Sequence, residues 1–337
     1  MSEYHIPVLL TESISALVTN PDGIYADATF GGGGHTAAIL SRLLDGGKLI
    51  AFDRDADALA NAPKDARLTL IHNNFRFIEN YAEELRRSLD FARDDKEGAR
   101  DDKEGARDDK EGARDDWEGP AVFDGILADL GVSSHQFDTA GRGFSFRFEE
   151  APLDMRMNRQ ASLTAEEVVN SYAEADLERI LRLYGEVDGS RNMARLIVQA
   201  RAQAALHTTG DLDRAIARML PKNAEHKVLA KVYQALRIEV NQEMRALEKF
   251  LDGAARSLKP GGRLVVITYH SLEDRMVKNF IKTGNVDGEQ RKDAFGRMET
   301  PLEAVNRKPV VPEESEIERN TRARSAKLRI AERRSAV

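Results

Sequence analysis

The sequence predicts an α/β fold in which a parallel sheet is interrupted by an all-helical insertion. Two observations predict the sheet: short apolar runs recur along the chain, and segments with apolar residues at helical spacing separate them. A third observation predicts the insertion. Between residues 138 and 222, four helical patterns follow one another with no strand pattern between them.

The strongest local signal is a glycine turn between two apolar runs. The first run, residues 24–29, contains Asp27, and positions 31–34 are all glycine. Glycine adopts backbone conformations that a Cβ would forbid, so we expect a tight turn leading into a helix. The second run ends at Asp53, 20 residues after Gly33. An acidic residue at that distance can accept hydrogen bonds from the hydroxyls of an adenosine ribose.

The glycine turn favours S-adenosylmethionine over phosphate-containing cofactors. A dinucleotide fingerprint that starts at Gly31 needs a third glycine where Thr36 stands, and a Walker-type loop needs Gly-Lys-Ser/Thr where His35 and Thr36 stand. S-adenosylmethionine has a ribose but no phosphate, and its charged methionine end and sulfonium suit a glycine turn near Asp27. A flexible turn without a ligand is the alternative, and the strand-turn-helix-strand context argues against it.

Two further strand ends are expected to carry ligand-binding side chains. An apolar run at 68–72 is followed by Phe75, which either lies against an adenine ring or belongs to the core. A run at 122–130 contains Asp129. Because ligands bind beyond the carboxyl ends of the strands in open α/β sheets, we expect Asp129 to share one crevice with the two earlier strand-end acids.

The predicted organisation has three parts. Residues 1–137 form the first part of the core, residues 138–222 form the helical insertion, and residues 223–337 form the second part of the core. The helical pattern from 229 to 240 is assigned to this second part. A strand at 263–269 follows, and a charged linker then leads to a last short strand at 325–330.

Composition limits the classes of function. The absence of cysteine excludes disulfides, thiolate zinc sites and cysteine nucleophiles, and no metal site is predicted. No run approaches about 18 apolar residues, and the first residues lack the basic start of a signal peptide. We therefore expect a soluble cytoplasmic protein with no membrane partner.

The net charge of -7 is unevenly distributed. Residues 92–119 are four heptapeptides that together carry -5. They have no apolar stripe for a coiled coil, and regular glycines with dense mixed charge argue against packing. The prediction is a disordered, solvated loop without chemistry, inserted after a helix at 78–89. Residues 315–337 hold seven Arg/Lys against three Glu, a net charge of +4, which favours contact with phosphates locally.

Longer motifs carry a resemblance to a known family. The chain resembles the bacterial 16S rRNA (cytosine-N4)-methyltransferases over nearly all its length except residues 90–119. His135, where that family often has proline, is a second departure. The motifs are Leu-Leu-x-Glu near the start, Asp-x-Thr-Phe-Gly-x-Gly-Gly-His at 27–35, Asp-Leu-Gly-Val-Ser-Ser at 129–134, Arg-Gly-Phe-Ser-Phe at 142–146, Pro-Leu-Asp-Met-Arg-Met at 152–157, His-Ser-Leu-Glu-Asp-Arg at 270–275 and Arg-Ala-Arg-Ser-x-x-Leu-Arg-Ile-Ala-Glu-Arg at 322–333.

The resemblance implies a Rossmann-like class I methyltransferase sheet whose helical insertion recognises the substrate. It implies S-adenosylmethionine-dependent N4-methylation of a cytosine in the decoding region of 16S rRNA, within the assembled 30S subunit. The oligomeric state stays open, and a homo-oligomer is compatible with the sequence. The cofactor contacts that it implies are Gly33, Gly34, His35, Asp53, Phe75, Asp129 and Gln136.

For the residues that meet the RNA, the sequence offers alternatives. Many exocyclic-amine methyltransferases have Asp/Asn-Pro-Pro-aromatic after the fourth strand. Here that strand ends in Asp129-Leu130-Gly131-Val132, so no acceptor for the amine proton is assigned. His270 and Ser271 either orient the base or cap a helix.

Arginines near aromatic residues and in the tail are the other candidates for contact with the RNA substrate. Arg142, beside aromatic residues at 144, 146 and 148, either clamps RNA or belongs to an aromatic hinge that packs the insertion. Arg322 and Arg324 are expected to contact phosphates, and the alternative is a solvated edge strand.

Two other classes of function are weighed against a methyltransferase. An NAD-dependent oxidoreductase needs a pyrophosphate-binding turn, which Thr36 disfavours. A non-catalytic RNA-binding factor explains the basic tail but not the acids at three strand ends. Retention of radiolabelled S-adenosylmethionine separates the three.

Overall fold

The structure is a computed structural model that describes residues 7–60, 62–97, 117, 119–292, 296 and 298–335. Most of the heptapeptide segment lies outside the described residues, and with it the predicted disordered loop. The chain divides into two compact units. The first consists of residues 1–53, 57–131 and 246–337, and the second of residues 54–56 and 132–245.

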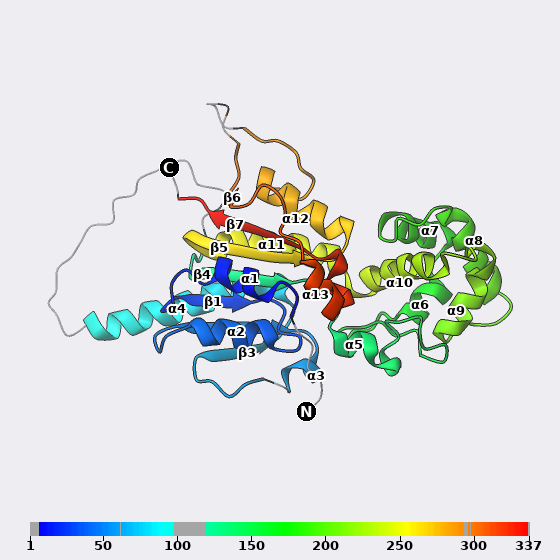
Figure 1. Cartoon of the computed structure of the whole chain (residues 1–337), viewed down its shortest axis with the longest axis horizontal. Helices are drawn as coiled ribbons and strands as arrows, with labels where there is room; N and C mark the ends of the chain where they lie inside the picture. Colours follow the sequence, from blue (N-terminus) through cyan, green and yellow to red (C-terminus); the bar gives the residue numbers. More distant parts are fainter. Residues whose placement is uncertain are drawn as a thin grey trace. The chain divides into compact units, whose positions relative to one another are not determined.

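In the described residues, the first unit is built on a seven-stranded sheet with the order β3-β2-β1-β4-β5-β7-β6 (Figure 1). The first five strands are parallel, and β7 runs antiparallel to both β5 and β6. The strand order reverses between β1 and β4, which is the point where such sheets bind ligands. The strands are β1 (Ile24–Asp27), β2 (Lys48–Asp53), β3 (Leu68–His72), β4 (Phe123–Asp129), β5 (Leu258–Thr268), β6 (Leu302–Ala304) and β7 (Lys327–Arg333).

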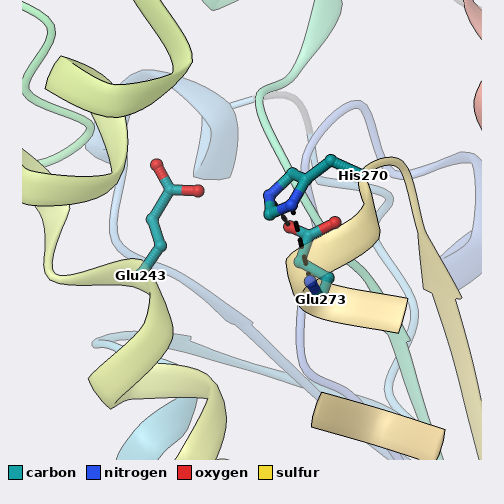
Figure 2. A group of neighbouring side chains, drawn as sticks. All are labelled: Glu243, His270 and Glu273. Carbon is teal, nitrogen blue, oxygen red and sulfur yellow. Dashed lines mark hydrogen bonds and ion pairs between the residues drawn. The ribbon is translucent and has the colours of Figure 1, made fainter. Parts of the chain in front are cut away.

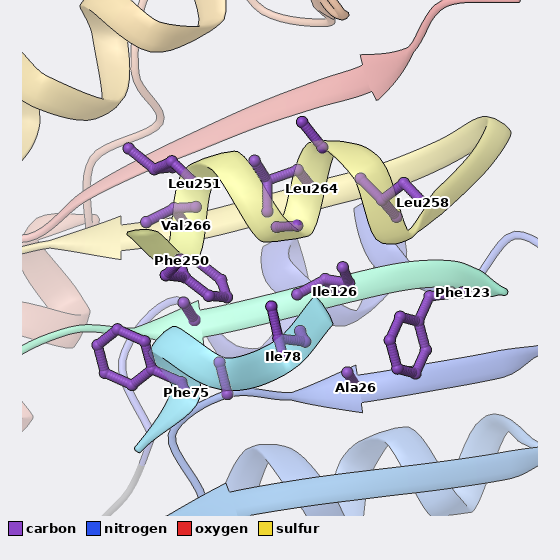
Figure 3. Packing of buried hydrophobic residues seen from close by; sticks show 14 of the residues in the cluster. Ala26, Phe75, Ile78, Phe123, Ile126, Phe250, Leu251, Leu258, Leu264 and Val266 are labelled. Carbon is purple, nitrogen blue, oxygen red and sulfur yellow. The ribbon is translucent and has the colours of Figure 1, made fainter. Parts of the chain in front are cut away.

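Alternate residues of each strand pack against helices on opposite faces of this sheet, because successive side chains of a strand point to opposite sides. On one face, Ala26 and Ile126 pack with α4 and α11 (Figure 3). On the other face, Tyr25 and Leu127 pack with α1 and α2. The helices of this unit are α1 (Leu10–Leu17), α2 (Gly34–Arg42), α3 (Ala56–Leu59, whose first residue belongs to the second unit), η1 (Phe75–Phe77), α4 (Ile78–Glu97), α11 (Glu243–Ser257, from residue 246 on), α12 (Ser271–Thr283), α13 (Glu314–Arg319) and η4 (Thr321–Ser325).

The second unit is helical and has its own apolar core. Its helices α7 and α8 pack together, and α10 packs on α6 and α7. The buried face of α10 was assigned from the sequence to the α/β core, but Val232 and Leu236 belong to the helical core. Helical periodicity shows which face is buried and not what covers it. The helices are α5 (Ser134–Asp138), η2 (Ala140–Arg142), α6 (Ala165–Ser171), α7 (Glu174–Leu183), α8 (Ser190–Arg201), α9 (Thr209–Ile216), η3 (Ala217–Met219) and α10 (Glu225–Asn241).

Three elements of the first unit differ from the prediction. Helix α4 continues through Glu97 into the first heptapeptide, where a helix at 78–89 was expected. The segment expected to be a charged linker contains α12 and β6. Strand β7 lies between β5 and β6 and is an inner strand, so the alternative of a solvated edge strand is wrong. Among the described residues, every helix is too short or too polar to span a bilayer.

Candidate active site at the strand ends

The turn after β1 requires its glycines for steric reasons. Gly33 has φ +77° and precedes α2, and a Cβ on it would lie 2.9 Å from the Phe30 ring. A Cβ on Gly34 would collide with the Pro7 ring. Both glycines that were predicted to contact the cofactor are therefore needed for the turn itself.

Asp53 ends β2 and holds this turn directly. The Gly31 backbone N–H donates to Asp53 Oδ2 at 2.8 Å. The carboxylate is half-buried, and β2 is the hydrogen-bonded neighbour of β1. The structure thus brings the predicted ribose acceptor together with the predicted glycine turn.

Asp27 ends β1 and is fully buried. Its Oδ2 accepts a hydrogen bond from Thr36 Oγ1 at 2.6 Å, and its Oδ1 accepts one from the Thr29 N–H at 3.0 Å. Burial raises the pKa of Asp27. These contacts tie α2 to β1 beneath the turn, and the place of this carboxylate beside the charged end of a cofactor stays a prediction.

Asp129 ends β4, the other neighbour of β1, and its side chain is 19% exposed. Tyr269, at the end of β5, donates its hydroxyl to Asp129 Oδ1 at 2.8 Å. The Asp129 N–H donates to Thr29 Oγ1 at 2.7 Å. Burial raises the pKa of Asp129 to about 7, the Tyr269 hydrogen bond lowers it, and the charge of Glu273 raises it further.

His35, in the first turn of α2, lies next to this carboxylate. Its Nδ1 is 3.6 Å from Asp129 Oδ2, which is longer than a hydrogen bond. The imidazole is 5% exposed, and burial lowers its pKa. His35 thus packs beside the carboxylate that ends β4, and its contact with the cofactor stays a prediction.

Phe75 lies just after β3 and is 8% exposed. Its ring makes an edge-to-face contact with Phe250 of α11, with 5.2 Å between the centroids. This packing favours the core alternative for Phe75. Its predicted contact with an adenine ring stays a prediction.

His270 and Glu273 form a pair at the start of α12 (Figure 2). The Glu273 N–H donates to His270 Nδ1 at 3.4 Å, and His270 Nε2 lies 3.1 Å from Glu273 Oε1. Glu273 is 2% exposed, and its Oε2 accepts the Tyr269 N–H at 2.9 Å. Since both ring nitrogens face Glu273, the helix-cap alternative is the better description of His270. Ser271, the first residue of α12, is exposed.

In the helical unit, Asp55 is the centre of a buried polar cluster. Arg142 Nη1 lies 2.9 Å from Asp55 Oδ2, and Gln136 Nε2 donates to the same oxygen at 2.7 Å. The Gln136 amide oxygen accepts the Ser133 N–H, which completes a capping box on α5. The amide predicted to contact the cofactor is therefore engaged at both ends within this unit.

Arg142 is 1% exposed, which argues against its predicted role as an RNA clamp. Besides Asp55, its guanidinium donates through Nη2 to the carbonyl oxygens of Arg156 and Met157. A buried guanidinium cannot meet a phosphate in solution. Arg142 instead holds the Asp55 carboxylate.

The aromatic run after Arg142 packs within the helical unit and lines a cavity of about 120 Å³. The Phe146 ring stacks on His226 and meets the edge of Tyr233. Arg147 is exposed and lies 5.3 Å from the centroid of Phe137. The cavity is lined by Val132, Phe137, Phe144, Phe146, Ala230, Tyr233, Gln234 and Arg237.

The basic tail has buried anchors and exposed arginines. Ala323 and Ala326 are buried in the core of the first unit, whereas Arg322 and Arg324 are exposed. Farther along, Arg329 donates to Asp274 at 2.7 Å. The tail therefore presents two arginines from a segment that is fixed to the sheet.

Sequence reasoning missed three residues of these clusters: Asp55, Tyr269 and Glu273. Asp55 follows Asp53 by two residues, and the other two flank His270 in its motif, so each lay beside a residue that was singled out. What the sequence did not show was which of these residues lie close together in space. Pairing β4 with β5 brings Tyr269 to Asp129, 140 positions earlier in the chain.

The seven-stranded sheet, with its glycine turn after β1 and helices on both faces, is the fold of class I methyltransferases. The chain belongs to the MraW methylase family, whose model matches residues 2–334. It is therefore a methyltransferase with S-adenosylmethionine as its methyl donor, and both alternative classes of function are wrong.

Relatives match over nearly the full length. Ribosomal RNA small subunit methyltransferase H from Bacteroides fragilis strain YCH46 is 51% identical over 331 residues, which cover 98% of each chain. The protein of the same name from Flavobacterium johnsoniae is 49% identical, again over 98% of each chain. Among solved structures, a methyltransferase homologue from Pyrococcus horikoshii matches with a TM-score of 0.38 and 14% identity, over 98% of this chain and 68% of that one.

Proposed function

We propose that this enzyme methylates N4 of a cytosine in the decoding region of 16S rRNA, acting on the assembled small ribosomal subunit. The observation that carries the rRNA substrate is the identity of about half of all residues, over 98% of both chains, to relatives named for small-subunit rRNA methylation. The choice of the cytosine, its N4 atom and the assembled subunit rests on the motifs described above.

The cofactor lies, in this proposal, across the ends of β1, β2 and β4. Asp53 accepts hydrogen bonds from the ribose hydroxyls, and the turn at Gly33 and Gly34 passes close to the methionine end. His35 and Asp129 complete the wall on the β4 side. Phe75 and Gln136 are the outer contacts, and each must release or share a contact made within its own unit.

Cytosine N4 is a poor nucleophile, because its lone pair is conjugated into the ring. Transfer therefore requires the base to leave any stack and to place N4 in line with the sulfonium methyl. Alignment of this kind can supply about 7–11 kcal/mol of the barrier. The methyl carbon then forms a bond to N4, and the sulfur leaves as a neutral thioether.

RNA recognition is assigned to the helical unit and the basic tail. Arg322 and Arg324 are exposed and contact phosphates. The aromatic cavity of the helical unit offers ring faces on which an unpaired base can stack. His270 and Ser271 remain candidates for base contact only through the outer surface of α12, since the imidazole nitrogens face Glu273.

Transfer of a radiolabelled methyl group tests the substrate. The purified enzyme is given S-adenosylmethionine with either isolated small subunits or naked 16S rRNA, and the product is mapped by mass spectrometry. We expect one methyl group on N4 of a decoding-region cytosine, with the small subunit as the better substrate. Label elsewhere, or on naked rRNA only, contradicts the proposal.

Calorimetry tests the cofactor site separately. Asp53→Ala should weaken S-adenosylmethionine binding by roughly 1–3 kcal/mol, because the ribose hydroxyls lose an acceptor. The exposed carboxylate of Asp287 provides the matched control, and Asp287→Ala should bind as the wild type does. An unchanged affinity in Asp53→Ala removes this residue from the site.

A further inference from the structure

We propose that Asp129 is the catalytic residue that accepts the proton leaving the cytosine amine, and that Tyr269 positions its carboxylate for this step. The inference rests on the proposed function, because it names the group that acts on the amine of that substrate. It supplies the acceptor that the sequence left unassigned.

Asp129 lies at the position where the sheet offers a ligand site. Strands β1 and β4 are neighbours, and the strand order reverses between them. Ligands of such sheets bind at this reversal, beyond the carboxyl ends of the strands. Of the two acids that end β1 and β4, Asp27 is fully buried and satisfied, whereas Asp129 is 19% exposed. Asp129 is therefore the one that a substrate can reach.

The two oxygens of Asp129 have different surroundings. Oδ1 accepts the Tyr269 hydroxyl at 2.8 Å. Oδ2 has His35 Nδ1 at 3.6 Å, beyond hydrogen-bond distance, and no closer donor within the described part of the chain. Oδ2 is thus the oxygen that can accept a hydrogen bond from an incoming amine.

Tyr269 is held at both ends, which makes it suitable as a positioning residue. Its backbone N–H donates to Glu273 Oε2 at 2.9 Å, and its hydroxyl donates to Asp129. Glu273 is in turn fixed beside His270 at the start of α12. The carboxylate of β4 is therefore oriented from β5 and α12.

Within the part of the chain that the structure describes, the charged and titratable groups that face Asp129 include no Arg or Lys. They are Asp27 from β1, His35 from α2, Tyr269 directly after β5 and Glu273 from α12. Burial favours neutral His35, and burial raises the pKa of Asp129 to about 7. A carboxylate whose pKa is about 7 can take up a proton and release it again at physiological pH.

The step balances with the two substrates alone. The N4 lone pair forms a bond to the methyl carbon, and the carbon–sulfur bond breaks with its electron pair on sulfur, giving neutral S-adenosylhomocysteine. The positive charge now lies on the cytosine, and one N4 proton passes to Asp129 Oδ2. The product is a neutral N4-methylcytosine, and Asp129 later returns the proton to water.

The test separates this role from a contact with the cofactor. Asp129→Asn keeps the shape of the side chain but cannot take the proton. With small subunits and S-adenosylmethionine saturating, we expect kcat to fall about 100-fold or more. Because asparagine keeps the size and hydrogen-bonding capacity of the side chain in the cofactor wall, calorimetry should give an S-adenosylmethionine Kd within about threefold of the wild type. Asp287→Asn, an exposed acid, is the matched control and should keep the wild-type kcat.

Tyr269→Phe gives an independent readout. Losing the hydroxyl removes a hydrogen bond that favours the charged carboxylate, so the acid limb of kcat should move to higher pH. The loss of activity is then larger at pH 6 than at pH 9, which a merely structural defect would not produce.

Three results overturn the inference: a kcat of Asp129→Asn within threefold of the wild type, a loss confined to S-adenosylmethionine affinity, or an unmoved acid limb in Tyr269→Phe. If the wild-type product carries no methyl group on N4, the proposed function fails first, and mass mapping shows this before any variant is compared.

Discussion

Asp129 in the first unit and Asp55 in the second are both largely buried carboxylates, yet their partners differ. Asp55 is 5% exposed and receives a guanidinium and an amide, from Arg142 and Gln136. Asp129 receives a hydroxyl from Tyr269, and among the described residues no Arg or Lys pairs with it. A carboxylate matched by a buried arginine is a fixed structural link, whereas one held by a hydroxyl can exchange a proton.

The arginines show the same contrast. Arg142 is buried and makes its contacts inside the helical unit, whereas Arg324 is exposed on a short anchored segment. Both stand in motifs that pointed to RNA. Accessibility, and not residue type or local motif, decides which of them can meet a phosphate.

The largest expected effect comes from breaking the buried pair. Arg142→Met should lower the free energy of unfolding of the helical unit by about 3–5 kcal/mol, because the buried Asp55 loses its guanidinium. Hydrogen exchange of peptides from residues 132–245 measures this. Adding Asp55→Asn should recover part of the loss. Arg147→Met, which breaks an exposed ion pair, should lower the free energy of unfolding by less than about 1 kcal/mol. Equal effects of the two arginine variants contradict the comparison.

Substitution of Asp129 should change the free energy of unfolding by a somewhat smaller amount, and it should raise the stability instead of lowering it. Its pKa lies at about 7 in the folded protein against an ordinary 3.8, so the folded state binds more protons than the unfolded state between these values. The stability contributed by this group is therefore lost as the pH rises through about 7.

Asp129→Asn removes this pH dependence. The variant should be more stable than the wild type by about 2–4 kcal/mol at pH 8 and nearly equal to it at pH 4. Urea denaturation of both proteins across this range measures the difference. A difference that does not grow with pH shows that Asp129 is charged without penalty in the folded state.

The smallest effect on stability is expected from the exposed arginines. Arg322→Ala with Arg324→Ala should change the unfolding free energy by no more than about 0.5 kcal/mol. Filter binding of small subunits, however, should show a difference. The slope of log affinity against log salt concentration should become shallower by roughly one unit for each lost phosphate contact. Arg87→Ala, at an exposed arginine of α4, is the control. A salt dependence that is flat in the wild type removes the tail from the interface.

Much of the sheet could be predicted because its signals are local. The glycine turn, Asp53 and Asp129 lie at the ends of the strands where short apolar runs placed them. The partners could not be predicted, since Arg142 reaches Asp55 across 87 positions of sequence and no periodicity encodes that distance. Buried helix faces were recognised, but α10 was paired with the wrong core, because an apolar stripe does not name its partner.

The placement of β7 has a consequence for biosynthesis. This strand pairs with β5 from Lys327 to Glu332 and so separates β5 from β6, although every other strand of the sheet is translated before it. Until residues 327–333 emerge from the ribosome, the nascent chain carries β5 with one long side unpaired, a surface prone to aggregation. A premature stop codon just before Lys327 would therefore yield a chain that contains every residue proposed for catalysis but cannot complete its sheet.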